Sequence, residues 1–310
     1  MPNWNDVLKE ITRRQNDHLI QAQTAVDIIR REYLKKLYNH TSRNIIAYYS
    51  GFLSKPGIAQ SDINDEDKNG FMMAVHKLDR TKGLDLILHT PGGDLAATQS
   101  IVNYLHKMFK MDIRAIVPQI AMSAGTMIAC SCRRILMTEH SNLGPIDPHL
   151  RGLPAYGVIE EFKRAYKEIK KDPSKIPLWG SIINQYKPTF LSQCENAIKW
   201  SNKFVEEQLE RVMFSGETNA KDKARNVRKK LSDYKENRSH VRHIHLEECK
   251  KIGLNVDRIE DDPDLQDLVL TVHHCFMHSL MNTNSFKMIE NQNGVALVKQ
   301  LPPPLPVHQR

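Results

Sequence analysis

The chain has 310 residues, of which 40% are hydrophobic, and this is enough to bury one large core. Its formal net charge of +8 raises the possibility of a nucleic-acid partner. The sequence has no uninterrupted apolar run long enough for a membrane-spanning helix. The first residues show no secretory signal, and the five cysteines form no Cys-x-x-Cys pair. These features exclude a disulfide framework and favour buried thiols in a reducing, cytoplasmic setting.

The N-terminal segment, residues 1–40, is predicted to be one long helix that begins after Asn3 and runs to about Tyr38. Its apolar stripe suits docking on a domain or on a second subunit. Residues 44–50 then read as the first strand. The acidic loop 62–67 lacks the glycine and terminal glutamate of an EF-hand, so we expect it to cap the following helix rather than to bind calcium.

Two glycine turns, residues 89–94 (HTPGGD) and 121–126 (AMSAGT), are the most informative motifs. Each closes an apolar run that is predicted to be a strand, over residues 84–88 and 113–117. Between them, apolar residues recur at helical spacing from Leu95 to Phe109, which predicts a crossover helix and therefore parallel strands. Both turns then lie at the carboxyl ends of neighbouring strands, where open α/β sheets place their ligand sites.

Ser123 lies in the second turn, directly before a helix of small residues predicted over 124–130. A hydroxyl nucleophile needs a sharp turn that presents its oxygen and nearby N–H groups that stabilise an oxyanion. We therefore predict Ser123 to be a nucleophile. Taken singly, each motif has a simpler interpretation, because Pro-Gly-Gly is commonly just a turn and a serine before a helix is commonly its N-cap.

The second half of the chain is predicted to be mostly helical after a strand at 134–138. The loop 141–148 carries Pro145 and Pro148, whose fixed backbone angles suit one wall of a substrate groove, and Gly92, Gly144 and Pro145 are assigned to that groove. Further elements are helices at 158–170, 190–213, 245–252 and 265–281, and a hairpin at 287–298.

Basic and histidine-rich segments of the same half are given structural roles. The basic stretch 221–242 is interpreted as a solvated helix face, because it has a single aromatic residue and so offers no stacking platform for nucleic acid. His274 and His278 are four residues apart, as metal ligands can be, but their neighbours are apolar, so no metal is assigned. Residues 301–310 form a Pro-rich tail.

Together, residues 89–93, 121–126 and 143–148 resemble the serine dehydrogenase proteinase family, a signal peptide peptidase A-like group with the fold of Clp protease and crotonase. The resemblance covers about residues 43–294, and residues 245–257 are similar to the return to the sheet seen in that fold. It implies an α/β domain over 41–300, built of repeated ββα units with a mostly parallel sheet, and a basic helical insertion at about 214–243. It also implies an ATP-independent serine peptidase without cofactor, acting on peptides or unfolded proteins as a homo-oligomer.

The resemblance also assigns site residues. Ser123 matches the nucleophile, and the N–H groups of Gly93 and Ala124 match the oxyanion hole. Signal peptide peptidases take the proton with a lysine roughly forty to fifty residues further on, in the same or a neighbouring subunit. Lys175 is preferred because the apolar residues 176–179 can bury it, with Lys171 and Lys187 behind it.

Clp proteases use a histidine instead, about twenty-five residues after the serine. His149 stands at that distance, with Asp147 beside it, although a histidine here departs from the proteinase family's pattern. Two other functions stay open on the same fold. One is crotonase-like acyl-CoA chemistry, and the other is a non-catalytic scaffold that binds protein or nucleic acid through the basic stretch and the tail.

Overall fold

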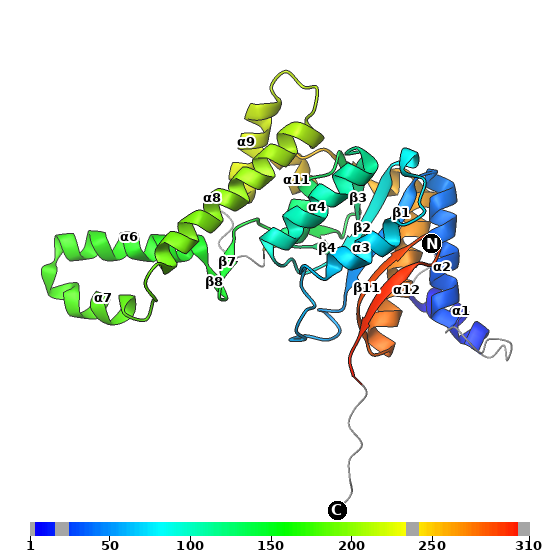
Figure 1. Cartoon of the computed structure of the whole chain (residues 1–310), viewed down its shortest axis with the longest axis horizontal. Helices are drawn as coiled ribbons and strands as arrows, with labels where there is room; N and C mark the ends of the chain where they lie inside the picture. The colour runs from blue at the N-terminus through cyan, green and yellow to red at the C-terminus, as the bar shows by residue number, and fades with distance from the viewer. Residues whose placement is uncertain (1–3, 16–24, 234–241, 303–310) are drawn as a thin grey trace, which may run out of the picture.

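A seven-stranded sheet forms the centre of the protein (Figure 1). The computed structural model describes residues 4–15, 25–233 and 242–302. The strand order is β10-β5-β3-β2-β1-β11-β12, and the five strands from β10 to β1 run parallel while β11 and β12 are antiparallel additions. The bounds are β1 Asn44–Ser50, β2 Leu84–His89, β3 Ile113–Val117, β5 Arg134–Met137, β10 Val256–Arg258, β11 Ser285–Asn291 and β12 Ala296–Gln300. The predicted α/β class with a mostly parallel sheet is confirmed.

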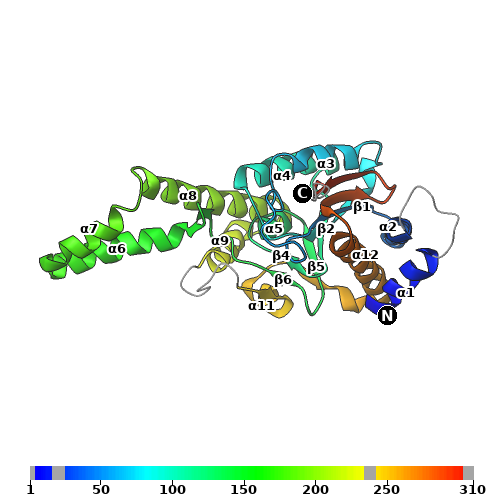
Figure 2. The ribbon, with the colours of Figure 1, turned by 90° about the horizontal axis from the view of Figure 1, so that it is seen from below.

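Helices cover both faces of the sheet, as Figures 1 and 2 show. Side chains alternate along each strand, so that Tyr48 and Leu86 join the core under one helical layer and Tyr49 and Ile87 join the core under the other. The first layer contains α3 (Asp67–Val75), α4 (Leu95–Phe109) and α5 (Ala124–Cys130), and the second contains α2 (Ala25–Thr41) and α12 (Pro263–Asn282). The near-continuous apolar runs of the central strands follow from this burial on both faces.

The N-terminal segment forms two helices where the sequence predicts one. α1 (Trp4–Gln15) packs against both α2 and α12, through a small cluster that includes Val7, Ile11, Ile29 and Cys275. Two helices that pack against each other cannot be one continuous rod, so that prediction is wrong. The expected docking on the main domain is found. Residues 16–24, between the two helices, lie outside the described residues.

A helical arm extends away from the sheet (Figures 1 and 2). It consists of α6 (Ala155–Lys171), a 3-10 turn at Pro173–Lys175, α7 (Ile176–Ile183) and α8 (Phe190–Gln208). α6 and α8 pack through Val158, Phe190 and Cys194, which are all buried. The sequence analysis did not predict α7, whose exposed Ile176 and Leu178 give no amphipathic pattern.

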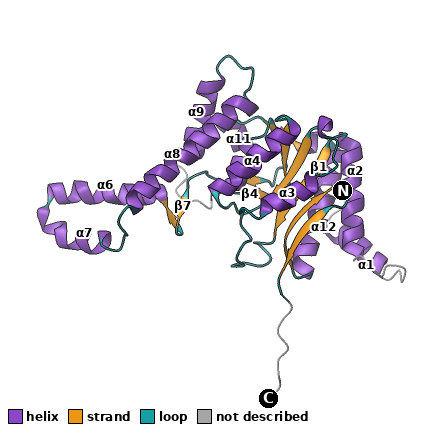
Figure 3. Ribbon diagram, in the orientation of Figure 1, coloured by secondary structure: helices purple, strands orange, loops and turns teal. Residues whose placement is uncertain are grey.

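Short elements complete the fold (Figure 3). A small sheet joins β4 (Ile120–Ala121), β6 (Asn142–Leu143) and β9 (Ile244–His245), and a hairpin joins β7 (His149–Leu150) to β8 (Leu153–Pro154). After α8, a π-helical turn (Leu209–Met213) leads to α9 (Ala220–Leu231), and α11 (Leu246–Ile252) precedes β10. Of the basic stretch and the Pro-rich tail, residues 234–241 and 303–310 lie outside the described residues.

All five cysteines are buried and unpaired with one another. Burial raises the pKa of the Cys130 thiol well above its ordinary range, so this group is a poor nucleophile. Within the described residues, no helix combines the length and apolar character needed to cross a bilayer.

Candidate active site

The two glycine turns are in direct contact. The N–H of Thr90 donates to the carbonyl oxygen of Ile120 at 3.1 Å, and the N–H of Met122 donates to the carbonyl oxygen of Thr90 at 3.0 Å. These bonds continue the parallel pairing of β2 with β3 past the ends of both strands. The expected adjacency of the two turns is therefore confirmed.

Ser123 adopts a strained backbone conformation, with φ of 51° and ψ of −113°. Such angles are rare for a residue with a side chain and are typical of functional turns. Its hydroxyl makes no capping hydrogen bond to α5, and the residue is partly exposed. A hydroxyl held in this way is available to a ligand, and simple helix capping does not account for it.

Gly92 lies directly against Ser123. Its φ is +107°, and a Cβ at this position would be 2.7 Å from the Cβ of Ser123. Only glycine allows this approach. The close contact explains why the Pro-Gly-Gly turn and the serine turn occur together.

The N–H groups of Ala124 and Gly93 belong to the two turns that meet at Ser123. Ala124 is the first residue of α5, so its N–H is one of the donors that a helix leaves without an internal partner. Gly93 forms an isolated bridge with Ile63, in which Ile63 N–H donates to Gly92 at 2.8 Å and Asp94 N–H donates to Ile63 at 2.9 Å. The N–H of Gly93 takes no part in this bridge.

A pocket of about 470 Å³ surrounds Ser123. Its volume falls in the range of small-ligand sites. The lining residues come from the loop before α3, both glycine turns, the start of α4, α5, the segment 148–150 and α8: Asp62, Pro91, Gly92, Gly93, Asp94, Leu95, Ser123, Met127, Pro148, His149, Leu150, Ala197 and Trp200. Gly92 lines this pocket, as the sequence predicts for the substrate groove.

Gly144 and Pro145 do not line the pocket. Both are buried, and a Cβ at Gly144 would be 2.6 Å from the terminal methyl of Met122. The N–H of Gly144 donates to Thr126 Oγ1 at 2.9 Å, which ties the loop 141–148 to α5 from behind. The sequence assigns both to the substrate groove, but of the loop that contains them only Pro148 lines this pocket, together with Leu150 of β7.

His149 and Asp147 are neighbours beside the pocket. His149 Nε2 lies 3.5 Å from Asp147 Oδ2, and the His149 side chain is 31% exposed while that of Asp147 is 3% exposed. A buried carboxylate next to a ring nitrogen can orient the imidazole. The structure thus brings Ser123 and His149 to one pocket and places Asp147 behind the histidine.

Lys175 lies elsewhere in the chain. It belongs to the turn between α6 and α7, at the far end of the arm (Figure 1). Its side chain is 41% exposed and its Nζ is 3.2 Å from Glu168. The expected burial by residues 176–179 is wrong, because Ile176 and Leu178 point into solvent. Lys171 and Lys187 are exposed too, and no lysine of the described chain lines the pocket at Ser123.

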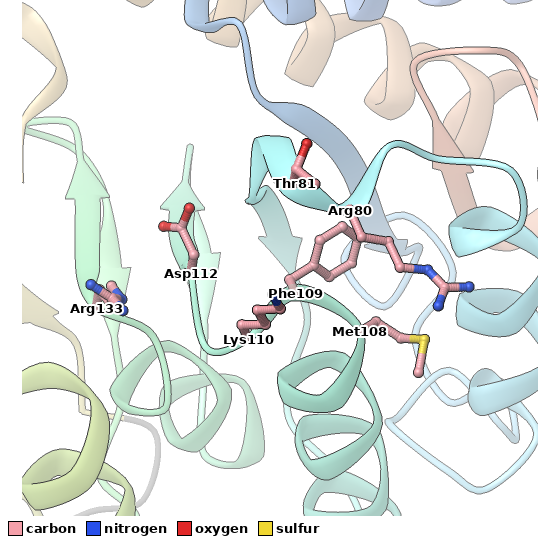
Figure 4. A pocket seen from close by; sticks show the side chains of 7 residues that line it. All are labelled: Arg80, Thr81, Met108, Phe109, Lys110, Asp112 and Arg133. Carbon is pink, nitrogen blue, oxygen red and sulfur yellow. The ribbon is translucent and has the colours of Figure 1, made fainter.

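A second pocket, of about 450 Å³, lies near the amino ends of β2, β3 and β5, whereas the two glycine turns follow the carboxyl ends of β2 and β3 (Figure 4). Its lining is largely charged: Arg80, Thr81, Met108, Phe109, Lys110, Asp112 and Arg133. Asp112 already accepts hydrogen bonds from Arg43. This pocket has no serine or histidine among its lining residues. Nowhere in the described residues do three His, Cys, Asp or Glu side chains gather as metal ligands.

Sequence reasoning missed three contributors to the site. Asp62 and Trp200 reach the pocket from a loop and a helix that are distant in sequence. Ile63 supports Gly93 through its backbone alone, so its side chain carries no signal of the role. The acidic loop 62–67, interpreted as a cap, is the only local hint at this region, and Asp67 is in fact buried at the start of α3.

A buried aromatic and histidine cluster lies under the first turn. His89, the last residue of β2, stacks on Tyr49 and lies 5.5 Å from His273, measured between ring centroids. Neither ring nitrogen of His89 has a hydrogen-bond partner among the described residues. Burial therefore lowers the pKa of His89 from 6.5 to about 3 and lowers that of His273 well below its ordinary value.

This cluster makes the fold sensitive to acid. Between about pH 3 and 6.5 the unfolded state binds a proton at position 89 that the folded state refuses, so the free energy of unfolding falls as the pH falls, by up to about 1.4 kcal/mol per unit for each such histidine. We expect His89→Phe to lose less stability between pH 7 and pH 5 than the natural protein does, as measured by urea unfolding. His245→Gln, at an exposed position, is the control. Equal losses in both variants would contradict this account.

The architecture and the site define a ClpP-like fold with a serine at the end of a parallel strand. The chain belongs to the ClpP-like SDH-type serine proteinase family, whose model matches residues 18–287. It is also similar to two proteins of Methanocaldococcus jannaschii described as uncharacterized proteins MJ0137 and MJ1495, at 31% and 27% identity over 195 residues. These matches cover 63% of this chain and 60% and 59% of the two relatives, so the chain matches about three fifths of the length of each.

Proposed function

We propose that the protein is an ATP-independent serine peptidase that hydrolyses peptide bonds in peptides or unfolded proteins, with Ser123 as the nucleophile. The observation that carries the proposal is the strained Ser123 turn, which opens into a pocket that Gly93 and His149 also line. The family to which the chain belongs supports a peptidase over other hydrolases. A cytoplasmic homo-oligomer is part of the same proposal.

The proposed reaction is acyl transfer in two halves. The Ser123 hydroxyl attacks the scissile carbonyl carbon while a base accepts its proton, and the oxyanion receives hydrogen bonds from Gly93 and Ala124 N–H. The intermediate collapses when the base returns the proton to the leaving amine. Water then attacks the acyl-enzyme by the same route and releases the acid and the free serine.

His149 is the general base that the geometry supports best. It lines the pocket of Ser123 and has the buried Asp147 as its orienting partner. Lys175, which the sequence favours, does not line the pocket of Ser123, and its partner Glu168 is not buried. A lysine supplied by a neighbouring subunit is the second candidate, and it is favoured by the resemblance to signal peptide peptidases.

Replacing the base separates these two candidates. We expect His149→Gln to lower the kcat for fluorescein-labelled casein by about 100-fold, because proton transfer by a positioned base contributes at least that much. Lys175→Met is the matched variant and keeps kcat within about twofold, since Lys175 pairs only with Glu168. The opposite ranking would exclude His149 and favour a lysine from the partner subunit.

A covalent probe tests the function itself. The protein is treated with a fluorophosphonate, digested, and searched by mass spectrometry for the modified peptide. An adduct on Ser123 supports the proposal, and an adduct elsewhere or none contradicts it.

Acyl-CoA binding by calorimetry without an adduct would point to crotonase-like chemistry. Salt-sensitive binding of protein or nucleic acid with an inert Ser123 would point to a scaffold.

A further inference from the structure

A buried ion pair lies close behind the active-site turn. Lys287 on β11 and Asp67 at the start of α3 are both fully buried, and Lys287 Nζ lies 2.9 Å and 3.0 Å from the two carboxylate oxygens. Lys287 pairs in register with Ser50, the last residue of β1. This places Lys287 beside the carboxyl ends of β1 and β2, where the Pro-Gly-Gly turn begins. The proposed peptidase reaction does not use either side chain directly.

This ion pair fixes the loop that precedes α3. Lys287 Nζ also donates to the carbonyl oxygen of Asp62 at 2.6 Å, and Asp67 Oδ2 accepts the N–H of Asn64 at 3.1 Å. The hydroxyl of Tyr48 donates to the same carboxylate at 2.8 Å. The residues on both sides of Ile63 are therefore tied to buried groups, and the backbone of Ile63 has little freedom to move.

Ile63 in turn supports the Gly92–Gly93 turn. Its N–H and its carbonyl make both hydrogen bonds of the bridge, at 2.8 Å to Gly92 and 2.9 Å to Asp94. The approach is so close that a Cβ at Gly93 would lie 2.3 Å from the nitrogen and the oxygen of Ile63. A shift of Ile63 would shift Gly93, and with it one of the two oxyanion donors.

Stability alone is a weak reason for such a pair. Desolvation of two buried charges costs about as much as their attraction returns, and apolar replacements of buried ion pairs are often neutral. Burial lowers the pKa of Lys287, and the neighbouring Asp67 opposes that effect. A pair with little net stabilisation, which binds one loop carbonyl and one loop N–H, suits the task of holding a loop in one position.

We propose that Lys287 and Asp67 are positioning residues: their ion pair holds Ile63 against Gly93, so that the Gly93 N–H stays where the oxyanion forms. This inference rests on the proposed function. It concerns the rate of attack rather than the binding of substrate, because the oxyanion exists only after Ser123 has attacked. Neither residue touches the substrate.

The test compares two buried ion pairs, each of which has one member on β11. Lys287→Met/Asp67→Asn removes both charges beside the loop. Arg30→Met/Glu290→Gln is the matched control, because Arg30 and Glu290 are equally buried, lie 2.6 Å apart and contact α2 and α12 instead. The readout is the rate of fluorophosphonate labelling of Ser123. Its dependence on probe concentration separates the maximal rate (kinact) from the half-saturating concentration (KI). Circular dichroism measures the folded fraction of each variant.

We expect the Lys287/Asp67 variant to lose at least about tenfold in kinact with KI unchanged, as for a displaced oxyanion donor. The Arg30/Glu290 variant keeps both values. A folded Lys287/Asp67 variant with the natural kinact overturns the inference. If that variant does not fold, Tyr48→Phe decides: it removes one hydrogen bond to Asp67, and an unchanged kinact overturns the inference. Absence of labelling in the natural protein overturns the proposed function, and the inference with it.

Discussion

Ser123→Ala is expected to abolish hydrolysis of fluorescein-labelled casein, with kcat reduced by about 10⁴-fold or more, since removal of a serine nucleophile leaves only binding and oxyanion stabilisation. Alanine fits the site, because the hydroxyl makes no capping hydrogen bond with α5. The fold should therefore be retained. The measurement is turnover at equal folded protein, and covalent labelling should be lost in parallel.

Ser131 provides the control at the other end of the same helix. It follows α5, is buried, and its hydroxyl donates to the carbonyl oxygen of Met127 at 2.7 Å. Ser131→Ala should cost stability, by about 1 kcal/mol, and leave kcat unchanged. A Ser123→Ala protein that still turned over casein would remove Ser123 from the mechanism altogether.

Gly93→Ala is expected to have the second largest effect. The new Cβ would lie 2.3 Å from the backbone of Ile63, and backbone atoms cannot yield as a flexible side chain does. The turn or the loop must shift, which moves the Gly93 N–H away from the oxyanion. We expect kcat to fall by about 100-fold or more, as when one oxyanion donor is removed. Casein turnover and the rate of probe labelling measure this loss.

Gly216→Ala separates the clash from backbone strain. Gly216 also has a positive φ, of +88°, but no atom lies within 4 Å of the place where its Cβ would be. Both variants suffer the same kind of strain, worth about 1 kcal/mol, while only Gly93→Ala displaces a neighbour. If the two variants lost activity equally, the contact between Gly93 and Ile63 would have no special role.

The parts of the site that the sequence predicts are those encoded by contiguous residues. The strands ending at the two turns and the crossover helix between them follow from local apolar periodicity, and the structure has them as β2, β3 and α4. Ser123 is conspicuous because its turn and its helix are adjacent in the sequence. The pair of Asp147 and His149 is visible for the same reason.

The parts that the sequence does not predict depend on contacts between distant residues. Ile63 and Gly93 meet through backbone atoms, so the glycine at 93 signals a close approach but not which residue approaches it. Lys287 and Asp67 are 220 residues apart and look like any two surface charges. The position of Lys175 depends on where a whole helical arm points, and no local pattern encodes that direction.

The pairing of β1 has a consequence for how the protein is made. β1 lies between β2 and β11, and its residue Ile46 pairs with Asn291, so one edge of this strand stays unpaired until β11 has left the ribosome. An apolar strand with a free edge is prone to pair wrongly during that delay. The central sheet therefore closes only after β11 has been made, and nascent chains that end before β11 are expected to need protection by chaperones.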